Sequence, residues 1–409
     1  MAEAGRYDVV VIGGGLLGLA TARNLLTDGP PGLRIAVLEQ ESDIALHQSG
    51  RNSGVIHRGI YYAPGSLKAR LCTTGSRRLT AYCDEKGIPW ERTGKVIVAL
   101  NEQELPRLDE LYRRGVANGV PGLKVIGPEH LRELEPSAVG VRAVHSPETG
   151  IVDFRRVAQA YADDVVHAGG EIRLESRVRS IEERGDEVRV MTDGGEIGTR
   201  YLIACAGLQS DRVAAMTDAS VRRAMRILPF RGDYFVLRPE RSFLCRSLIY
   251  PVPDLRFPFL GVHFTKRMDG SIWAGPNAVL ALARERYGRA DVRIADVVDT
   301  VTFAGFWHLA MAHWRMGMSE AWRDVARHAF GDALRRFVPD LRDDDLLPGP
   351  AGNRAQAVAA DGSLVDDFRI TASGRSIHVR NAPSPGATSS LAIGEMIARH
   401  ARRRFTLDA

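Results

Sequence analysis

Three glycines near the start of this 409-residue chain have the spacing G-x-G-x-x-G, at Gly13, Gly15 and Gly18. In this order the first glycine permits a tight turn, the second lets the backbone approach a pyrophosphate, and the third lets a helix pack closely on a strand. Glu39 follows 21 residues after Gly18 and can accept hydrogen bonds from ribose hydroxyls. The spacing predicts a dinucleotide site whose acidic residue disfavours a 2′-phosphate.

A polar, glycine-rich segment at 47–62 follows soon after, with the sequence HQSGRNSGVIHRGIYY. A nicotinamide-binding domain would return to another strand-helix repeat at this point, whereas a small-residue polar loop suits a flavin ring and its ribityl chain. We therefore expect FAD, contacted by Ser49, Arg51, Asn52 and Ser53.

The elements that must position these residues are visible in the hydrophobic pattern. Residues 7–12 and 35–38 are short β-branched runs that predict buried strands, and residues 16–26 between them have helical spacing. Residues 153–167 predict a further helix, 171–178 and 187–191 predict strands, and 200–207 predicts a strand that ends in glycine. In a flavoprotein of this architecture we expect Val178, Ala206 and Gly207 to meet the cofactor.

Beyond these elements the chain resembles the L-2-hydroxyglutarate dehydrogenase/oxidase family of the D-amino-acid-oxidase superfamily. The matching stretches run through nearly the whole chain: NSGVIH at 52–57, YYAPGSLKA at 61–69, PFRG at 229–232, PFLGVH at 258–263, AGPNAVL at 274–280 and NAPSPGATSS at 381–390. The resemblance implies noncovalent FAD, oxidation of a 2-hydroxy acid to a 2-keto acid by hydride transfer to flavin N5, and electrons passed to O2 or to a quinone.

The chain departs from the family pattern at five positions, several of them in segments expected to face flavin or substrate. These are Arg51, Arg58, Asp233, Asn353 and Arg380. The departures leave the fold prediction unchanged. They leave open whether the substrate is L-2-hydroxyglutarate or a different, larger anionic hydroxy acid.

Two histidines are candidates for the base that removes the hydroxyl proton. Imidazole titrates near neutrality, and His57 lies in the predicted flavin loop. His263 is the rival, on a predicted strand where its side chain faces opposite to Val262 and Phe264. The alternatives are that His57 only hydrogen-bonds flavin or backbone, and that His263 is an ordinary core histidine.

Fixed cations must hold the carboxylate of such a substrate, because a guanidinium binds a carboxylate through two hydrogen bonds. We favour Arg231, between Phe230 and Gly232, then Arg354, with Arg58 as a further candidate. The side chains expected to orient the hydroxy acid, or simply to form the wall of its pocket, are Tyr61, Tyr62 and Thr265.

The segment before the last predicted helix can stabilise negative charge on a reduced flavin, since free N–H groups at a helix start favour anions. The residues expected to do so are Ser384, Gly386, Ala387, Thr388 and Ser389. An ordinary capped helix start is the alternative.

The fold prediction is therefore α/β with an α+β second lobe: a Rossmann-like FAD-binding domain and a mixed-sheet substrate domain, as in D-amino-acid oxidase. The FAD-binding domain is expected to be discontinuous, over 1–90, 150–220 and 350–409. The substrate domain is expected over 91–149 and 221–349, with strands near 234–237, 248–250, 262–265 and 271–274 and helices over 290–338.

Composition excludes several other classes. The net charge of +5 is not gathered into long basic runs, so nucleic acid is not an expected partner. The four cysteines form no C-x-x-C, so no metal site is expected, and a reducing, cytoplasmic location is favoured. An aromatic and methionine-rich stretch at 303–322 could contact the inner face of a membrane, or could be an ordinary buried helical face.

Two other functions stay open at this point. An amine or amino-acid oxidase on the same fold would break a C–N bond. A non-catalytic flavin-binding, membrane-associated module would not need His57 or Arg231.

Overall fold

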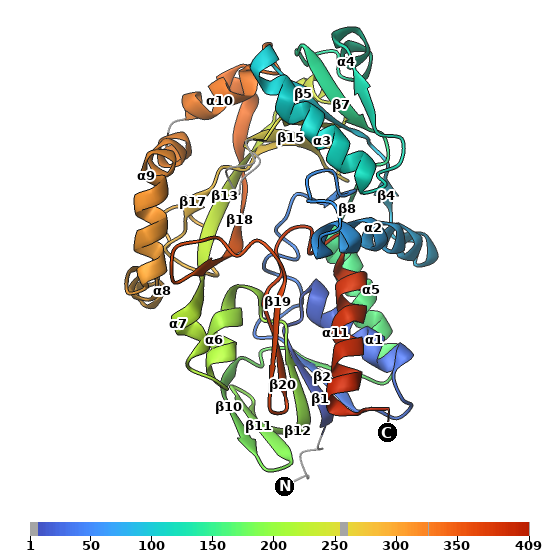
Figure 1. Ribbon diagram of the computed structural model, residues 1–409, viewed down its shortest axis with the longest axis vertical. Coiled ribbons are helices and arrows are strands. Elements are labelled where there is room, and N and C mark those ends of the chain that lie inside the picture. The colour runs from blue at the N-terminus through green and yellow to red at the C-terminus, as the bar shows by residue number, and fades with distance from the viewer. Residues whose placement is uncertain (1–6, 254–260, 326, 409) are drawn as a thin grey trace.

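A computed structural model describes residues 7–253, 261–325 and 327–408 of the chain (Figure 1). Two large sheets organise these residues, one at each end of the long axis in Figure 1.

The first sheet has eight strands and a parallel core. In spatial order, the core strands are β9 (Glu171–Arg173), β2 (Ile35–Leu38), β1 (Tyr7–Ile12), β12 (Gly195–Ala204) and β20 (Ser376–Asn381). Antiparallel additions are β10 (Val178–Arg184) and β11 (Glu187–Thr192) beyond β12, and β19 (Arg369–Ser373) beside β20.

Both faces of this sheet are covered, which explains why β1 shows no polar alternation. Val9 and Val11 pack on a layer of helices, whereas Val10 and Ile12 pack toward β10, β11 and α6 (Ser210–Ala215). The helices of the first layer are α1 (Leu16–Asp28), α2 (Leu67–Glu85), α5 (Phe154–His167) and α11 (Ser390–Phe405).

The second sheet has nine strands and is mostly antiparallel. Its order is β17 (Val279–Leu280), β13 (Met225–Leu237), β16 (Ile272–Gly275), β15 (His263–Lys266), β14 (Leu248–Pro251), β5 (Lys95–Ala99), β7 (Arg142–Ser146) and β6 (Lys124–Ile126), with β18 (Leu346–Ala359) on the other edge of β13. A small sheet of β3 (Val55–Ile56), β8 (Gly150–Val152) and β4 (Trp90–Glu91) lies between the two.

The remaining helices lie around the second sheet and the junction between the two sheets. They are α3 (Leu105–Ala117), α4 (Pro128–Leu134), α6 (Ser210–Ala215), α7 (Val221–Ala224), α8 (Ile294–Val301), α9 (Ala304–Val325) and α10 (Arg327–Arg335).

The predicted elements are confirmed with small shifts at their ends. One prediction was wrong: 171–178 is not one strand, because β9 pairs with β2 whereas β10, which starts at Val178, pairs with β11. The division into two domains stays a prediction. Its boundary at 349/350 falls inside β18, which pairs along β13 in the second sheet, so residues 350–359 lie with the substrate-side strands.

Candidate active site

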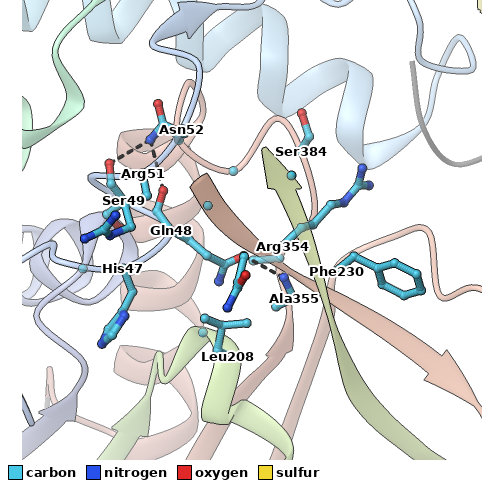
Figure 2. A pocket seen from close by; sticks show the side chains of 18 of the residues that line it. His47, Gln48, Ser49, Arg51, Asn52, Leu208, Phe230, Arg354, Ala355 and Ser384 are labelled. Carbon is cyan, nitrogen blue, oxygen red and sulfur yellow. Dashed lines mark hydrogen bonds between the residues drawn. The ribbon is translucent and has the colours of Figure 1, made fainter. Parts of the chain in front are cut away.

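A cavity of about 1100 Å³ runs from the carboxyl ends of β1 and β2 to the second sheet. At one end it is lined by the glycine loop and Glu39, and at the other by His57, Tyr250 and His263. Figure 2 shows the middle of this cavity, with Gln48, Arg354 and Phe230 around it. Nearly all cofactor-contact residues predicted from the sequence line it: Gly13, Gly15, Glu39, Ser49, Arg51, Asn52, Ser53, Val178, Ala206, Gly207, Ser384, Gly386, Ala387 and Thr388.

The glycines of the first loop are required by close backbone contacts. A Cβ at Gly18 would lie 1.9 Å from the carbonyl oxygen of Gly13, and Gly13 itself has a φ of +110°. A Cβ at Gly15 would lie 2.9 Å from Oγ of Ser49. Gly18 therefore acts through packing behind the loop, whereas Gly13 and Gly15 line the cavity.

The nucleotide end is built to receive a dinucleotide. The Glu39 carboxylate accepts hydrogen bonds from the backbone N–H of Gly14 at 2.8 Å and of Glu41 at 3.1 Å, and still lines the cavity. The start of α1 has no side-chain cap from Gly15, and the Leu16 N–H is met by the Ser49 hydroxyl at 3.0 Å. A glycine cradle, an open helix start and a carboxylate at the end of β2 fit the pyrophosphate and ribose of FAD.

The loop after β2 is held by the side chain of Asn52. Its amide Nδ2 donates to the carbonyls of Gln48 (3.1 Å) and Ser49 (2.7 Å), and its Oδ1 accepts from the Gly54 N–H at 2.8 Å. Asn52 therefore fixes the shape of the segment that the sequence assigned to the flavin.

The segment before α11 is tied directly to this loop. The Thr388 hydroxyl accepts from the His57 N–H at 3.1 Å and donates to the Val55 carbonyl at 3.2 Å. Ser389, predicted as a cofactor contact, does not line the cavity. A Cβ at Gly75 would lie 2.6 Å from the Cα of Ser389, so the absence of a side chain at Gly75 permits the close contact between α2 and the start of α11.

Both candidate bases line the far end of the cavity. His263 donates from Nδ1 to the Gly261 carbonyl at 2.8 Å, which leaves Nε2 as an acceptor, and its ring stacks on Tyr250 at 3.8 Å. The Nδ1 atom of His57 is buried with no partner among the described residues. Burial, with a contribution from the charge of Lys95, lowers the pKa of His57 to about 3 and that of His263 to about 4, so both rings are neutral at pH 7.

The predicted arginines are placed differently from one another. Arg354 lines the cavity and in Figure 2 reaches from β18 toward Ser384. Arg231 is buried outside the lining, with Nε 3.0 Å from Oδ1 of Asp233. Arg58 also lies outside the lining and donates from Nε to the Glu148 carbonyl at 2.6 Å.

Tyr61, Tyr62 and Thr265 do not line the cavity. Thr265 is 1% exposed, and burial raises the pKa of both phenols well above the usual range. Tyr61 packs against the cluster that contains Ile97 and Tyr250, and Thr265 lies within β15 of the second sheet.

The remaining departures from the family pattern have mainly structural partners. Asn353 donates from Nδ2 to the carbonyls of residues 283, 284 and 286 at 2.9–3.1 Å. Arg380 donates to the Val221 carbonyl at 2.7 Å, although it also lines the cavity. The Arg51 guanidinium lies 3.9 Å from the centre of the Tyr287 ring, and Asp233 binds Arg289 at 3.1 Å besides Arg231.

Sequence reasoning missed two residues of the far end, Lys95 and Tyr250. Both are 1% exposed, and the Lys95 ammonium lies 5.0 Å from the centre of the Tyr250 ring. The feature of the sequence that points to Lys95 is a single charge at the start of the apolar run KVIVA at 95–99. Among the described residues no group of three metal-binding side chains occurs.

These features define the class. Residues 8–400 match the family described as FAD dependent oxidoreductase. In structure the chain is similar to the L-alpha-glycerophosphate oxidase of Mycoplasma pneumoniae with FAD bound, with a TM-score of 0.77 and 23% identity over 99% of this chain and 95% of that one. It is also similar to the glycine oxidase of Geobacillus kaustophilus, with a TM-score of 0.70 and 18% identity over 97% of this chain and 95% of that one. The chain belongs to the FAD-dependent oxidoreductases.

The more similar sequences narrow the family further. The chain is 47% identical to the mitochondrial L-2-hydroxyglutarate dehydrogenase of Homo sapiens, over 99% of this chain and 91% of that protein. It is 45% identical to the L-2-hydroxyglutarate dehydrogenase of Indibacter alkaliphilus, over 98% and 100%. Within the FAD-dependent oxidoreductases, its family is therefore that of the L-2-hydroxyglutarate dehydrogenases.

Proposed function

We propose that this enzyme oxidises L-2-hydroxyglutarate to 2-oxoglutarate with noncovalently bound FAD. The observation that carries the proposal is one continuous cavity that joins a dinucleotide site to an end bearing two neutral histidines and Arg354. Relatives of 45–47% identity over nearly the whole chain carry this activity in their names.

The chain supplies a proton acceptor and a carboxylate partner. A neutral imidazole with a free ring nitrogen can accept the hydroxyl proton, which His263 offers at Nε2 and His57 at Nδ1. Arg354 lines the cavity and is placed to bind a carboxylate. Arg231, which pairs with Asp233 outside the lining, stays the second candidate that the sequence suggested. When bound, FAD supplies the acceptor, flavin N5, for the hydride that leaves the substrate carbon.

Other residues that line the cavity would position the cofactor. Glu39, the open start of α1 and the segment from Ser384 to Thr388 would hold the ribose, the pyrophosphate and the flavin respectively. The segment from Ser384 to Thr388 is hydrogen-bonded to the His57 backbone through Thr388. This segment would therefore hold the flavin in a fixed position relative to the candidate base.

Oxidation of an amine or amino acid is the second candidate, because glycine oxidase has this fold. We expect purified enzyme with a dye acceptor to reduce the dye with L-2-hydroxyglutarate and not with glycine, L-proline or L-glutamate. Turnover of an amino acid alone would reverse the assignment. Turnover of larger anionic hydroxy acids alone would keep the reaction and change the substrate.

For the electron acceptor, O2 or a quinone, a surface on α8 and α9 favours the quinone. Ile294, Val298 and Val301 on α8 are 78%, 50% and 40% exposed and have the spacing i, i+4, i+7. On α9, Trp307 and Met311 are 53% and 65% exposed and lie about one turn apart, and Trp314, at 55%, follows the kink of this helix at His313. Both helices thus present large apolar side chains to solvent, and tryptophan suits a membrane interface.

We propose that this α8–α9 surface contacts the inner face of a membrane from the cytoplasmic side. Phe303 and Phe306, counted in it from the sequence, pack instead against Leu228 and Val358. The side chains of Met316, Met318 and Trp322 lie outside those described. No helix among the described residues is long and apolar enough to span a bilayer.

Sedimentation with lipid vesicles tests this contact. We expect the wild type to sediment with vesicles containing anionic lipid, and a Trp307→Glu/Met311→Glu variant to stay in the supernatant. Val166→Glu, which changes an apolar side chain 56% exposed on α5, is the matched control. Equal sedimentation of all three proteins would reject the α8–α9 surface.

A further inference from the structure

Lys95 is a lysine in the protein interior without a carboxylate partner. It is 1% exposed, opens β5 and lies opposite Ser146 of β7, so its backbone is fixed in the second sheet. No Asp or Glu of the described residues forms an ion pair with it, unlike Lys68, Lys86 and Lys266. Burying an ammonium in this way is costly unless something else compensates the charge.

The groups around the Lys95 ammonium give only weak compensation. Nζ lies 3.5 Å from the Tyr61 hydroxyl, 4.7 Å from the centre of the Tyr61 ring and 5.0 Å from that of Tyr250. The Cys72 thiol on α2 is a further titratable neighbour, but burial raises its pKa to about 12, so it stays neutral and supplies no counter-charge near pH 7. Burial therefore dominates and lowers the pKa of Lys95 to about 7.

The amine is coupled to the cavity although it does not line it. Tyr250 lies between, with one contact to Lys95 and a stacked contact to the ring of His263. The charge of Lys95 is also one of the causes that lower the pKa of His57 and of His263. This end of the cavity therefore holds Lys95, His57 and His263, and none of the three has an acid partner among the described residues.

We propose that Lys95 is a positioning residue that becomes charged when the anionic substrate enters, drawing the carboxylate toward the two histidines as a proton is taken up from solvent. The proposal rests on the proposed oxidation of a carboxylic acid and adds a proton-linked step to substrate binding. A carboxylate near the Tyr250 wall supplies the counter-charge that the fold omits, so it favours the ammonium form. The same ammonium disfavours imidazolium, so the histidines remain acceptors.

Proton uptake on binding of 2-oxoglutarate to the oxidised holoenzyme measures this step. Calorimetry in two buffers of different ionisation enthalpy gives the number of protons taken up. At a pH equal to a pKa of about 7 half of the amines are neutral, so we expect uptake of about half a proton per site at pH 7. At pH 6 about one amine in ten is neutral, so uptake falls toward 0.1. Titration of His57 or His263 would instead make uptake grow as the pH falls.

Two variants separate the charge from its titration. Lys95→Met removes both, so we expect no uptake and about 10-fold weaker binding at pH 6. Lys95→Arg keeps a charge that does not titrate near neutrality, so it should bind 2-oxoglutarate nearly as the wild type does, again without uptake. Lys86→Met, which removes a lysine paired with Asp164 at the end of α2, is the control and should match the wild type.

The outcomes distinguish this proposal from the proposed function. Uptake that persists in Lys95→Met with FAD retained, or wild-type binding without uptake, overturns the role of Lys95 and leaves the reaction intact. A wild-type holoenzyme that neither binds 2-oxoglutarate nor is reduced by L-2-hydroxyglutarate overturns both.

Discussion

Replacing Gly18 with alanine should remove FAD from the enzyme without unfolding it. The added Cβ would lie 1.9 Å from the Gly13 carbonyl oxygen, whereas Cβ contacts below 3.0 Å essentially do not occur. The obstacle is backbone, so relief requires α1 and the glycine loop to separate by about 1.1 Å, the difference between 3.0 and 1.9 Å.

The cost to FAD follows from that displacement. The loop and the start of α1 are the elements that we propose to hold the pyrophosphate, and a shift of about 1 Å breaks a hydrogen bond of ordinary length. One hydrogen bond to a charged group contributes about 1.5–3 kcal/mol, so its loss weakens binding roughly 10- to 150-fold. Loss of a second bond would multiply this factor.

Titration of apoprotein with FAD, followed by quenching of flavin fluorescence, measures the effect. Gly127→Ala is the matched control, because Gly127 precedes α4 with a φ of −81° and a Cβ there would meet nothing within 4 Å. A folded Gly18→Ala protein that binds FAD as tightly as Gly127→Ala would refute the assignment of this loop to the cofactor.

Two further predictions concern the substrate side of the cavity, and a third concerns two buried histidines, of which His378 on β20 lies outside the cavity lining. His57→Ala should retain FAD but lose rapid flavin reduction by substrate, and an unchanged reduction rate in rapid mixing would reject His57 as the base. Arg354→Ala should raise KM at least about 10-fold in steady-state assays, because the variant loses substrate carboxylate binding before chemistry. A similar rise in KM for Arg231→Ala would show that Arg231 also binds substrate despite its ion pair with Asp233. His263 and His378 are buried with pKa values of about 4, against 6.5 in the unfolded chain, so the unfolded chain binds more protons below pH 6.5. Urea titrations should therefore show the free energy of unfolding falling by about 3 kcal/mol for each histidine between pH 6.5 and 4. A free energy of unfolding that does not change over this pH range would contradict their burial as neutral rings.

The nucleotide end could be predicted from sequence because its requirements are local. A positive φ at Gly13 and a backbone contact at Gly18 permit only glycine, and Glu39 follows directly from the end of a buried strand. His263 could be found as well, since alternation along β15 places it opposite to its apolar neighbours.

The substrate end depends on packing between distant segments, and the sequence does not show which side of a wall a residue occupies. Tyr61 and Thr265 lie behind the cavity because the segment after β3 packs on the second sheet. The pairing of Arg231 with Asp233 could have been predicted from the sequence, because residues two apart on a strand share a face. The burial of Lys95 could not be predicted in this way, because a charge at the start of an apolar run usually marks a strand end in solvent.

Anaerobic rapid mixing of the purified holoenzyme with L-2-hydroxyglutarate tests the central claim most directly. The flavin absorbance band should bleach in a single rapid phase with this enantiomer, whereas D-2-hydroxyglutarate should leave it unchanged. A holoenzyme that stays oxidised with L-2-hydroxyglutarate, yet is reduced by an amino acid, would contradict the proposed reaction.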